Sequence, residues 1–188
     1  MSQETLSTAA AIGTFVVIAA TAIAAVVQLR HLRAQNQLTG LLTVLARVEA
    51  PEFNSWVDGA REMVNTRLSD PNYRQAIIDG TVERKNNPWL NLSNSYDWVG
   101  SLVKHKLIPE EPLLDVYAVR VIQAWAIVES IIPLIRKRSG PAVWENFEYL
   151  VVQARKWNEQ HADGAYPKGV PRLQINATWP ELEAATSA

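Results

Sequence analysis

No charged residue occurs between Glu4 and Arg30, so 25 consecutive positions carry no charge. This stretch contains no Pro and a single Gly, and most of its side chains are Ala, Val, Ile, Leu or Phe. A helix of that length measures ~37 Å at ~1.5 Å per residue, which exceeds the ~30 Å hydrocarbon core of a bilayer. The pattern therefore predicts one transmembrane helix over residues 9–29, preceded by a short extracytoplasmic N-terminus of residues 1–8.

The residues around the apolar stretch indicate whether it is a membrane anchor or a cleaved signal peptide, and which way it crosses the membrane. A cleaved signal peptide carries Lys or Arg before an apolar run that is shorter than this one, and no basic residue precedes the stretch here. Residues 20–22 and 22–24 do match the small-x-small pattern of cleavage sites. An anchor is therefore favoured over a cleaved signal and over a buried helix of a soluble protein. Basic residues follow the stretch and none precedes it, so the positive-inside rule predicts an outer N-terminus and a cytoplasmic C-terminal domain at the inner membrane.

Small residues recur at a spacing of four within the predicted span. Gly13 lies four positions from Ala9 and from Val17, and Ala20 lies four positions from Ala24. Such spacing lets two spans pack closely, which keeps open a homo-oligomer assembled through the membrane. In an Ala-rich helix the same spacing arises by chance, so it does not by itself predict self-association.

The charge and cysteine content after the span exclude several classes of function. All 18 Lys and Arg and 18 of the 19 Asp and Glu lie there, so this part is formally neutral. A nucleic-acid-binding domain concentrates basic residues on one element, and we therefore expect no nucleic-acid partner. Cys is absent, which excludes disulfides, a thiolate nucleophile and thiolate metal ligands.

The ten Pro residues, all from Pro51 onward, divide the remaining chain into segments of helical length. Apolar residues at spacings of three and four continue the membrane helix through residues 28–50, and this stripe is expected to pack on the domain. We expect five further helices, over residues 51–68, 71–79, 89–106, 113–135 and 141–157. The predicted fold is thus all-α, with the span continuing into a cytoplasmic bundle of about five helices (residues 30–161) and an irregular C-terminal tail (residues 162–188).

The most apolar of these segments, Leu113 to Ile135, is expected to form the centre of the domain and to be buried on most sides. A second membrane span is disfavoured here, because each charged residue within it costs about 2.5–3.5 kcal/mol at a bilayer centre. The basic run at residues 136–138 follows. It is interpreted as a complement to the dipole of the helix end rather than as a site for anionic headgroups.

Few residues are arranged for catalysis or metal binding. None of the three His has another His or a carboxylate three or four positions before it, as a helical metal site would require. No Gly-rich phosphate loop, G-x-S-x-G or H-E-x-x-H motif occurs. Asp115 and Glu129 are the one pair of acid–base candidates, because both fall roughly on one side of the predicted central helix. Pairing of such carboxylates with Arg is the commoner reading, so we predict no catalytic, cofactor-binding or metal-binding residues.

Three segments between Tyr96 and Trp157 carry a family resemblance: WVGSLVKHKLIPEE, LLDVYAVRVIQAWAIVESIIPLIRKRSG and PAVWENFEYLV. They resemble a bacterial family of uncharacterised proteins, a domain of unknown function that pairs one N-terminal membrane helix with an all-helical cytoplasmic domain. Pro109 departs from this family, in which an acidic or polar helix cap is expected. The resemblance implies a topology and assigns no catalytic residue.

Anchor, helical domain and lack of catalytic motifs together predict a non-enzymatic interaction or adaptor module held in the lipid bilayer, with a protein partner at the cytoplasmic face. Two alternatives from other classes stay open. One is a small helical enzyme with its acid–base site at Asp115 and Glu129. The other is a homo-oligomeric membrane protein assembled through the span.

Overall fold

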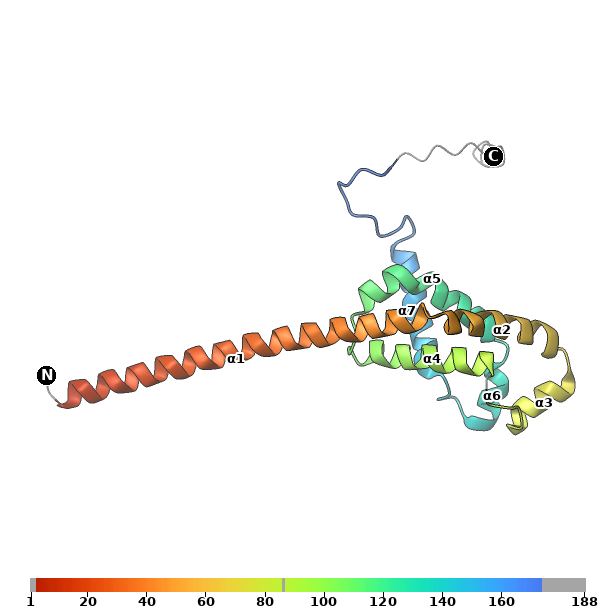
Figure 1. The fold of residues 1–188 in the computed structure, drawn as a ribbon, viewed down its shortest axis with the longest axis horizontal. Helices are drawn as coiled ribbons and strands as arrows, with labels where there is room; N and C mark the ends of the chain where they lie inside the picture. The colour runs from red at the N-terminus through yellow and green to blue at the C-terminus, as the bar shows by residue number, and fades with distance from the viewer. Residues whose placement is uncertain (1–2, 86, 174–188) are drawn as a thin grey trace.

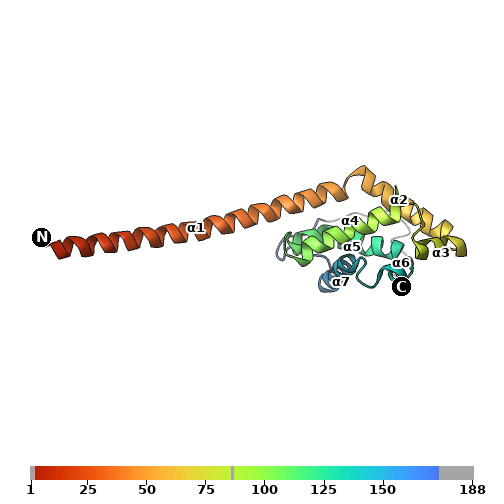
Figure 2. The same cartoon turned by 90° about the horizontal axis from the view of Figure 1, so that it is seen from below.

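A computed structural model describes residues 3–85 and 87–173, so the end of the predicted C-terminal tail, residues 174–188, lies outside the described residues. The described chain is entirely helical, with seven helices and no strand, which confirms the all-α fold class. The helices are α1 (Gln3–Val48), α2 (Pro51–Arg67), α3 (Pro71–Asp79), α4 (Pro88–Lys104), α5 (Glu110–Val128), α6 (Ile132–Ser139) and α7 (Glu145–Gln160). Helix α1 projects far beyond the others, which gather around its C-terminal end (Figure 1, Figure 2).

Helix α1 runs for 46 residues without a break, through Gly40, as the sequence predicts. At ~1.5 Å per residue its length is about 69 Å. The large apolar side chains from Ile12 to Val27 are exposed, and among the described helices α1 is the one that is long and apolar enough to cross a membrane by itself. The stretch predicted as a span is therefore a helix of sufficient length whose apolar surface no other part of the described chain covers.

The last turns of α1 belong to the core of the domain. Leu41, Val44 and Val48 are buried with the residues of the other helices, whereas the earlier leucines of the predicted stripe remain exposed. Beyond the helix end, the Tyr117 hydroxyl of α5 donates a 2.7 Å hydrogen bond to the Glu49 carboxylate. Burial, together with this bond, raises the pKa of Tyr117 to about 12, so the phenol remains protonated at neutral pH. Helix α1 and the domain are thus one continuous structure.

Helix α3 has the boundaries that its local sequence predicts. The Asp70 carboxylate accepts the backbone N–H of Asn72 at 2.9 Å, Pro71 occupies the first helical position, and Gly80 ends the helix with φ +74°. The polar loop that follows ends at a cap that the sequence analysis missed. Asn87 accepts the Leu90 N–H at 3.3 Å and starts α4.

The apolar stretch after Pro109 is two helices, so the prediction of one central helix up to Ile135 is wrong. Helices α5 and α6 meet at 71°, and Pro133 lies in the first turn of α6, where its missing N–H is tolerated. Six helices therefore follow α1 in the described part of the chain. The outer face of α5 is not buried either, since Val116 is 63% and Val119 is 55% exposed.

Helices α4 and α7 approach each other closely at Gly100. A Cβ atom added to Gly100 would lie 2.0 Å from the backbone oxygen of Asn146, so the two backbones meet without an intervening side chain. The Asp97 carboxylate of α4 accepts the backbone N–H groups of Asn146 and Phe147, both at 3.1 Å. These groups open α7, which begins at Glu145 and not at Pro141 as predicted.

Phe147 links this contact to the centre of the core. Its ring stacks on Tyr96 of α4 at 5.0 Å and meets Trp125 of α5 edge-on at 5.1 Å. Helix α7 is thereby held between α4 and α5. Helix α2 packs on α4 and α5, and α3 packs on α6.

Replacing Asp97 with Ala leaves the first N–H groups of α7 without their acceptor. We expect the free energy of unfolding to fall by about 1–2 kcal/mol, measured by urea denaturation of the full chain in detergent. Asp115→Ala is the matched control, because Asp115 also lies inside a helix but is exposed and has no hydrogen bond or ion pair within the described chain. Its expected change is below about 0.5 kcal/mol, and equal losses in the two variants would contradict the capping role.

Candidate functional site

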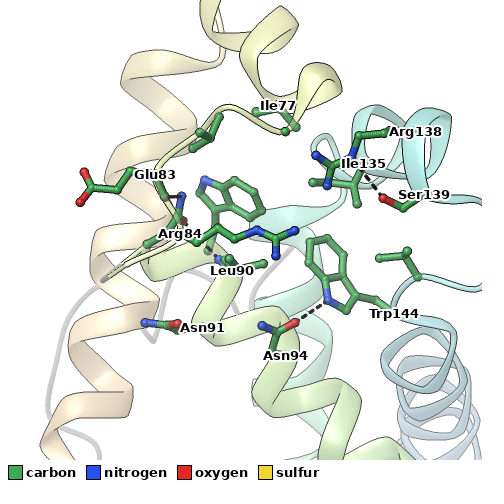
Figure 3. Close-up of a pocket in the computed structure, with 15 residues that line it drawn as sticks. Ile77, Glu83, Arg84, Leu90, Asn91, Asn94, Ile135, Arg138, Ser139 and Trp144 are labelled. Carbon is green, nitrogen blue, oxygen red and sulfur yellow. Dashed lines mark hydrogen bonds between the residues drawn. The ribbon is translucent and has the colours of Figure 1, made fainter.

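A pocket of about 420 Å³ is lined by residues of α3, α6 and the start of α4, among others. These elements lie at the end of the domain farthest from the free end of α1 (Figure 1). Its walls come from α3, the loop of residues 81–87, the first turns of α4, helix α6 and the turn before α7. Figure 3 shows the side chains that surround it. The elements are held together by the packing of α3 on α6 and of α4 on α7, so the pocket is built from parts that lie far apart in the sequence.

Two tryptophans form the inner wall of the pocket. Trp89 and Trp144 are buried and meet edge-on, with their ring centroids 6.2 Å apart. The Trp89 indole N–H donates to the Tyr73 hydroxyl at 3.0 Å, and that of Trp144 donates to the Asn94 side-chain oxygen at 2.9 Å. Both rings are therefore fixed in place, and their polar atoms are already bonded within the protein.

Two arginines lie at the mouth of the pocket. Arg84 comes from the loop before α4 and Arg138 from the last turn of α6, and their guanidinium groups point toward the same space above the tryptophans (Figure 3). Within the described residues neither forms an ion pair, and the bond of Arg138 Nε to Ser139 Oγ, at 3.3 Å, is the one hydrogen bond found for either. Two positive charges thus face one cavity without a carboxylate partner from the described chain.

The Arg138 guanidinium lies against Gly80. A Cβ atom at position 80 would lie 1.2 Å from a guanidinium nitrogen of Arg138, so the guanidinium occupies the space that any other residue's side chain would fill. Gly80 also has φ +74°, which favours glycine. The end of α3 is therefore shaped so that the end of α6 can place Arg138 at the pocket.

The structure separates the three basic residues that the sequence analysis grouped at the end of the central segment. Arg136 donates to the Val143 carbonyl oxygen at 3.0 Å and pairs with Glu148 at 2.6 Å, so it ties α6 to α7. Lys137 is exposed, and Arg138 lies at the pocket. The predicted role of complementing the helix dipole describes their position but misses these two contacts.

The acid–base candidates are not brought together. Asp115 and Glu129 are both exposed, and neither lines the pocket. They lie 14 positions apart along α5 and its C-terminal cap, which corresponds to ~21 Å. The buried pair that the enzyme alternative requires is therefore absent from the described chain.

The histidines lie at helix ends or on the exposed part of α1. His105 and His161 occupy the C-terminal caps of α4 and α7, and the His161 ring stacks on Trp157 at 4.0 Å. Across residues 3–85 and 87–173, no group of three or more His, Asp or Glu side chains is arranged to hold a metal ion.

Sequence reasoning missed the pocket because its residues carry no common local pattern. Arg84 and Arg138 are 54 positions apart, and the first lies in a stretch, TVERKNNP, that reads only as a polar loop. Asn94 lies among the apolar positions of a helix. The one local signal was the density of tryptophans, which by itself indicates core packing as well as a binding wall.

A family model described as Domain of unknown function (DUF4760) matches residues 15–157. The match begins inside the apolar part of α1 and ends in α7, so it covers most of α1, the helical core and the pocket. It also contains the segments on which the resemblance to an uncharacterised family was based, and that expectation is confirmed. No curated protein and no solved structure matches the chain.

Replacing Gly80 with Ala is expected to destabilise the domain by about 1–3 kcal/mol, because the new methyl group displaces Arg138 and the backbone remains in the left-handed region. Gly169→Ala is the control, since Gly169 has φ +83° and no atom within 4 Å of its Cβ position. Urea denaturation of both variants separates the two contributions. A loss no larger for Gly80→Ala than for Gly169→Ala would show that Arg138 is not held by this contact.

Proposed function

We propose that this chain, which belongs to the DUF4760 family of unknown function, is a single-pass membrane protein that holds a non-enzymatic interaction module at the cytoplasmic face of the inner membrane. The observation that supports this proposal is the continuity of α1. The same helix contains the exposed apolar stretch and, in Leu41, Val44 and Val48, part of the buried core of the domain. No linker separates the anchor from the domain.

The length of the exposed segment between span and domain supports a position close to the lipid surface. Residues 30–36 are exposed on all sides and correspond to about 10 Å of helix. The headgroup layer on each side of the hydrocarbon core is about 5–8 Å thick. Arg30, His31 and Arg33 lie in this segment, at the level of the headgroups, where cytoplasmic basic residues are enriched.

The outer surface of α5 supports an interaction role. Val116 and Val119 are exposed on a helix whose opposite face forms the core, and Leu38 and Leu42 of α1 are exposed within the domain as well. Apolar side chains placed next to one another on an exposed helix face are typical of surfaces that another protein covers. None of the carboxylates of the described helix α5 is buried, so this helix offers no buried carboxylate pair for acid–base catalysis.

Protease digestion tests the anchoring and the orientation. In intact cells we expect the domain to be protected from added protease, and in opened membrane vesicles we expect it to be cut. We also expect the full chain to stay in the membrane fraction after washing with high salt or alkaline carbonate. Cleavage in intact cells would reverse the proposed orientation, and release of a soluble fragment starting near Ala25 would show that α1 is a cleaved signal.

Photo-crosslinking tests the interaction role. A photoreactive amino acid at Val116 or Val119 is expected to give the same discrete crosslinked protein in membranes, while one at Lys156, an exposed position on α7, is expected to give none. Val119→Asp should reduce the yield from position 116 at least several-fold, because it places a charge on the apolar contact. Equal crosslinking from all three positions would reject the α5 surface. A product that is a second copy of this chain would favour the homo-oligomer.

A further inference from the structure

We propose that the pocket between α3, α4 and α6 binds a small organic anion, with one phosphate or carboxylate group carried on a flat apolar body. This site is separate from the anchor and from the outer surface of α5, and its occupancy does not depend on either. Two arginines, a set of free hydrogen-bond donors and two tryptophans surround one cavity of about 420 Å³ (Figure 3).

The charge at the pocket mouth selects for an anion. The three ion pairs found among the described residues involve Asp58, Glu145 and Glu148, and none of them includes Arg84 or Arg138. Glu83 lines the same loop, but its carboxylate points away from the two guanidinium groups (Figure 3). Two guanidinium groups from separate elements that converge on one space match the oxygen atoms of a phosphate or carboxylate, which arginine binds with paired hydrogen bonds.

The neutral side chains around the pocket also offer donors. The Asn94 side-chain oxygen is taken by the Trp144 indole, which leaves the Asn94 amide N–H groups for a ligand. The Ser139 hydroxyl oxygen accepts from Arg138, which leaves the hydroxyl hydrogen. The Asn87 side-chain oxygen accepts the Leu90 N–H, and its amide nitrogen donates to the Glu83 carbonyl oxygen. A ligand here meets free donors, which suits a group that carries acceptors alone.

The inner wall selects for a flat apolar body. Both indole N–H groups are bonded elsewhere, and Trp89 and Trp144 are only 3% and 6% exposed. The apolar surface that is open to the cavity therefore comes mainly from the half-buried side chains of Val82, Leu90 and Val143, with the two rings behind them. A volume of about 420 Å³ is within the usual range of small-molecule sites and holds a ring together with one anionic group. A free inorganic anion would fill the mouth and leave this wall uncovered.

The position of the pocket favours a soluble ligand over a lipid headgroup. Helices α3 and α6 and the start of α4, which line the pocket, lie at the end of the domain farthest from the apolar half of α1 (Figure 1). A headgroup of the membrane that α1 would cross is therefore on the opposite side of the domain. The ligand is accordingly a dissolved molecule that carries its own phosphate or carboxylate.

Calorimetric titration of the full chain in nanodiscs of zwitterionic lipid, at low salt, tests this site. The probes are phenyl phosphate and benzoate, which separate the two anionic groups, with inorganic phosphate and benzyl alcohol as their partial mimics. We expect at least one aromatic anion to bind saturably, with one molecule per chain. We expect inorganic phosphate and benzyl alcohol to bind at least roughly tenfold more weakly than the aromatic anions. Inorganic phosphate lacks the apolar ring, and benzyl alcohol lacks the anionic group.

Sequence neighbours of equal charge provide the controls. Arg84→Gln and Arg138→Gln are each expected to weaken the binding roughly tenfold or more, whereas Lys85→Gln and Lys137→Gln stay within about twofold. Arg84 is exposed and has no hydrogen bond in the described chain, so its variant retains the fold. The site is overturned if neither aromatic anion binds at millimolar concentration, or if the lysine variants weaken binding as much as the arginine variants. If benzyl alcohol bound as tightly as benzoate, the proposed recognition of an anionic group would be overturned. If inorganic phosphate bound as tightly as phenyl phosphate, the proposed recognition of an apolar body would be overturned.

Discussion

The carboxylate of Asp97 fixes the point at which α7 begins, and much of the domain depends on that point. The residue before the helix, Trp144, has a positive φ and provides no side-chain cap, so the acceptor must come from another helix. It can do so because Gly100, one turn further along α4, lets the two backbones touch. This junction places Phe147 in the aromatic core on one side and the Trp144 ring beside Trp89 on the other. The core and the pocket therefore share one wall.

Features with a local cause could be predicted from the sequence. The start and end of α3 follow from Asp70, Pro71 and Gly80, each of which acts on its own neighbours. The length of α1 follows from a long run of residues without Pro, and the all-α class follows from apolar residues at helical spacing. The segments between Tyr96 and Trp157 were sufficient to indicate the family. In each case the signal lies within a few residues of the feature that it predicts.

Features with a distant cause could not be predicted. The break between α5 and α6 leaves its apolar flanks buried, so the sequence reads as one continuous segment. The beginning of α7 is set by Asp97, some 50 positions earlier. The exposure of Val116 and Val119 reverses the rule that an apolar helix is buried on most sides. The pocket depends on how α3 packs against α6, and no local pattern in the loop before α4 or in α6 indicates that Arg84 and Arg138 face one cavity.

The unbroken course of α1 makes the orientation of the domain a matter of helical phase. Each residue turns the helix by ~100° and lengthens it by ~1.5 Å. One residue more or fewer in the exposed segment of residues 30–36 would swing the whole domain about a quarter turn around the axis of the helix. A full turn more would raise it with little rotation. The number of residues in this segment therefore sets the direction in which the pocket and the outer α5 face point around the axis of α1, relative to the proposed lipid plane.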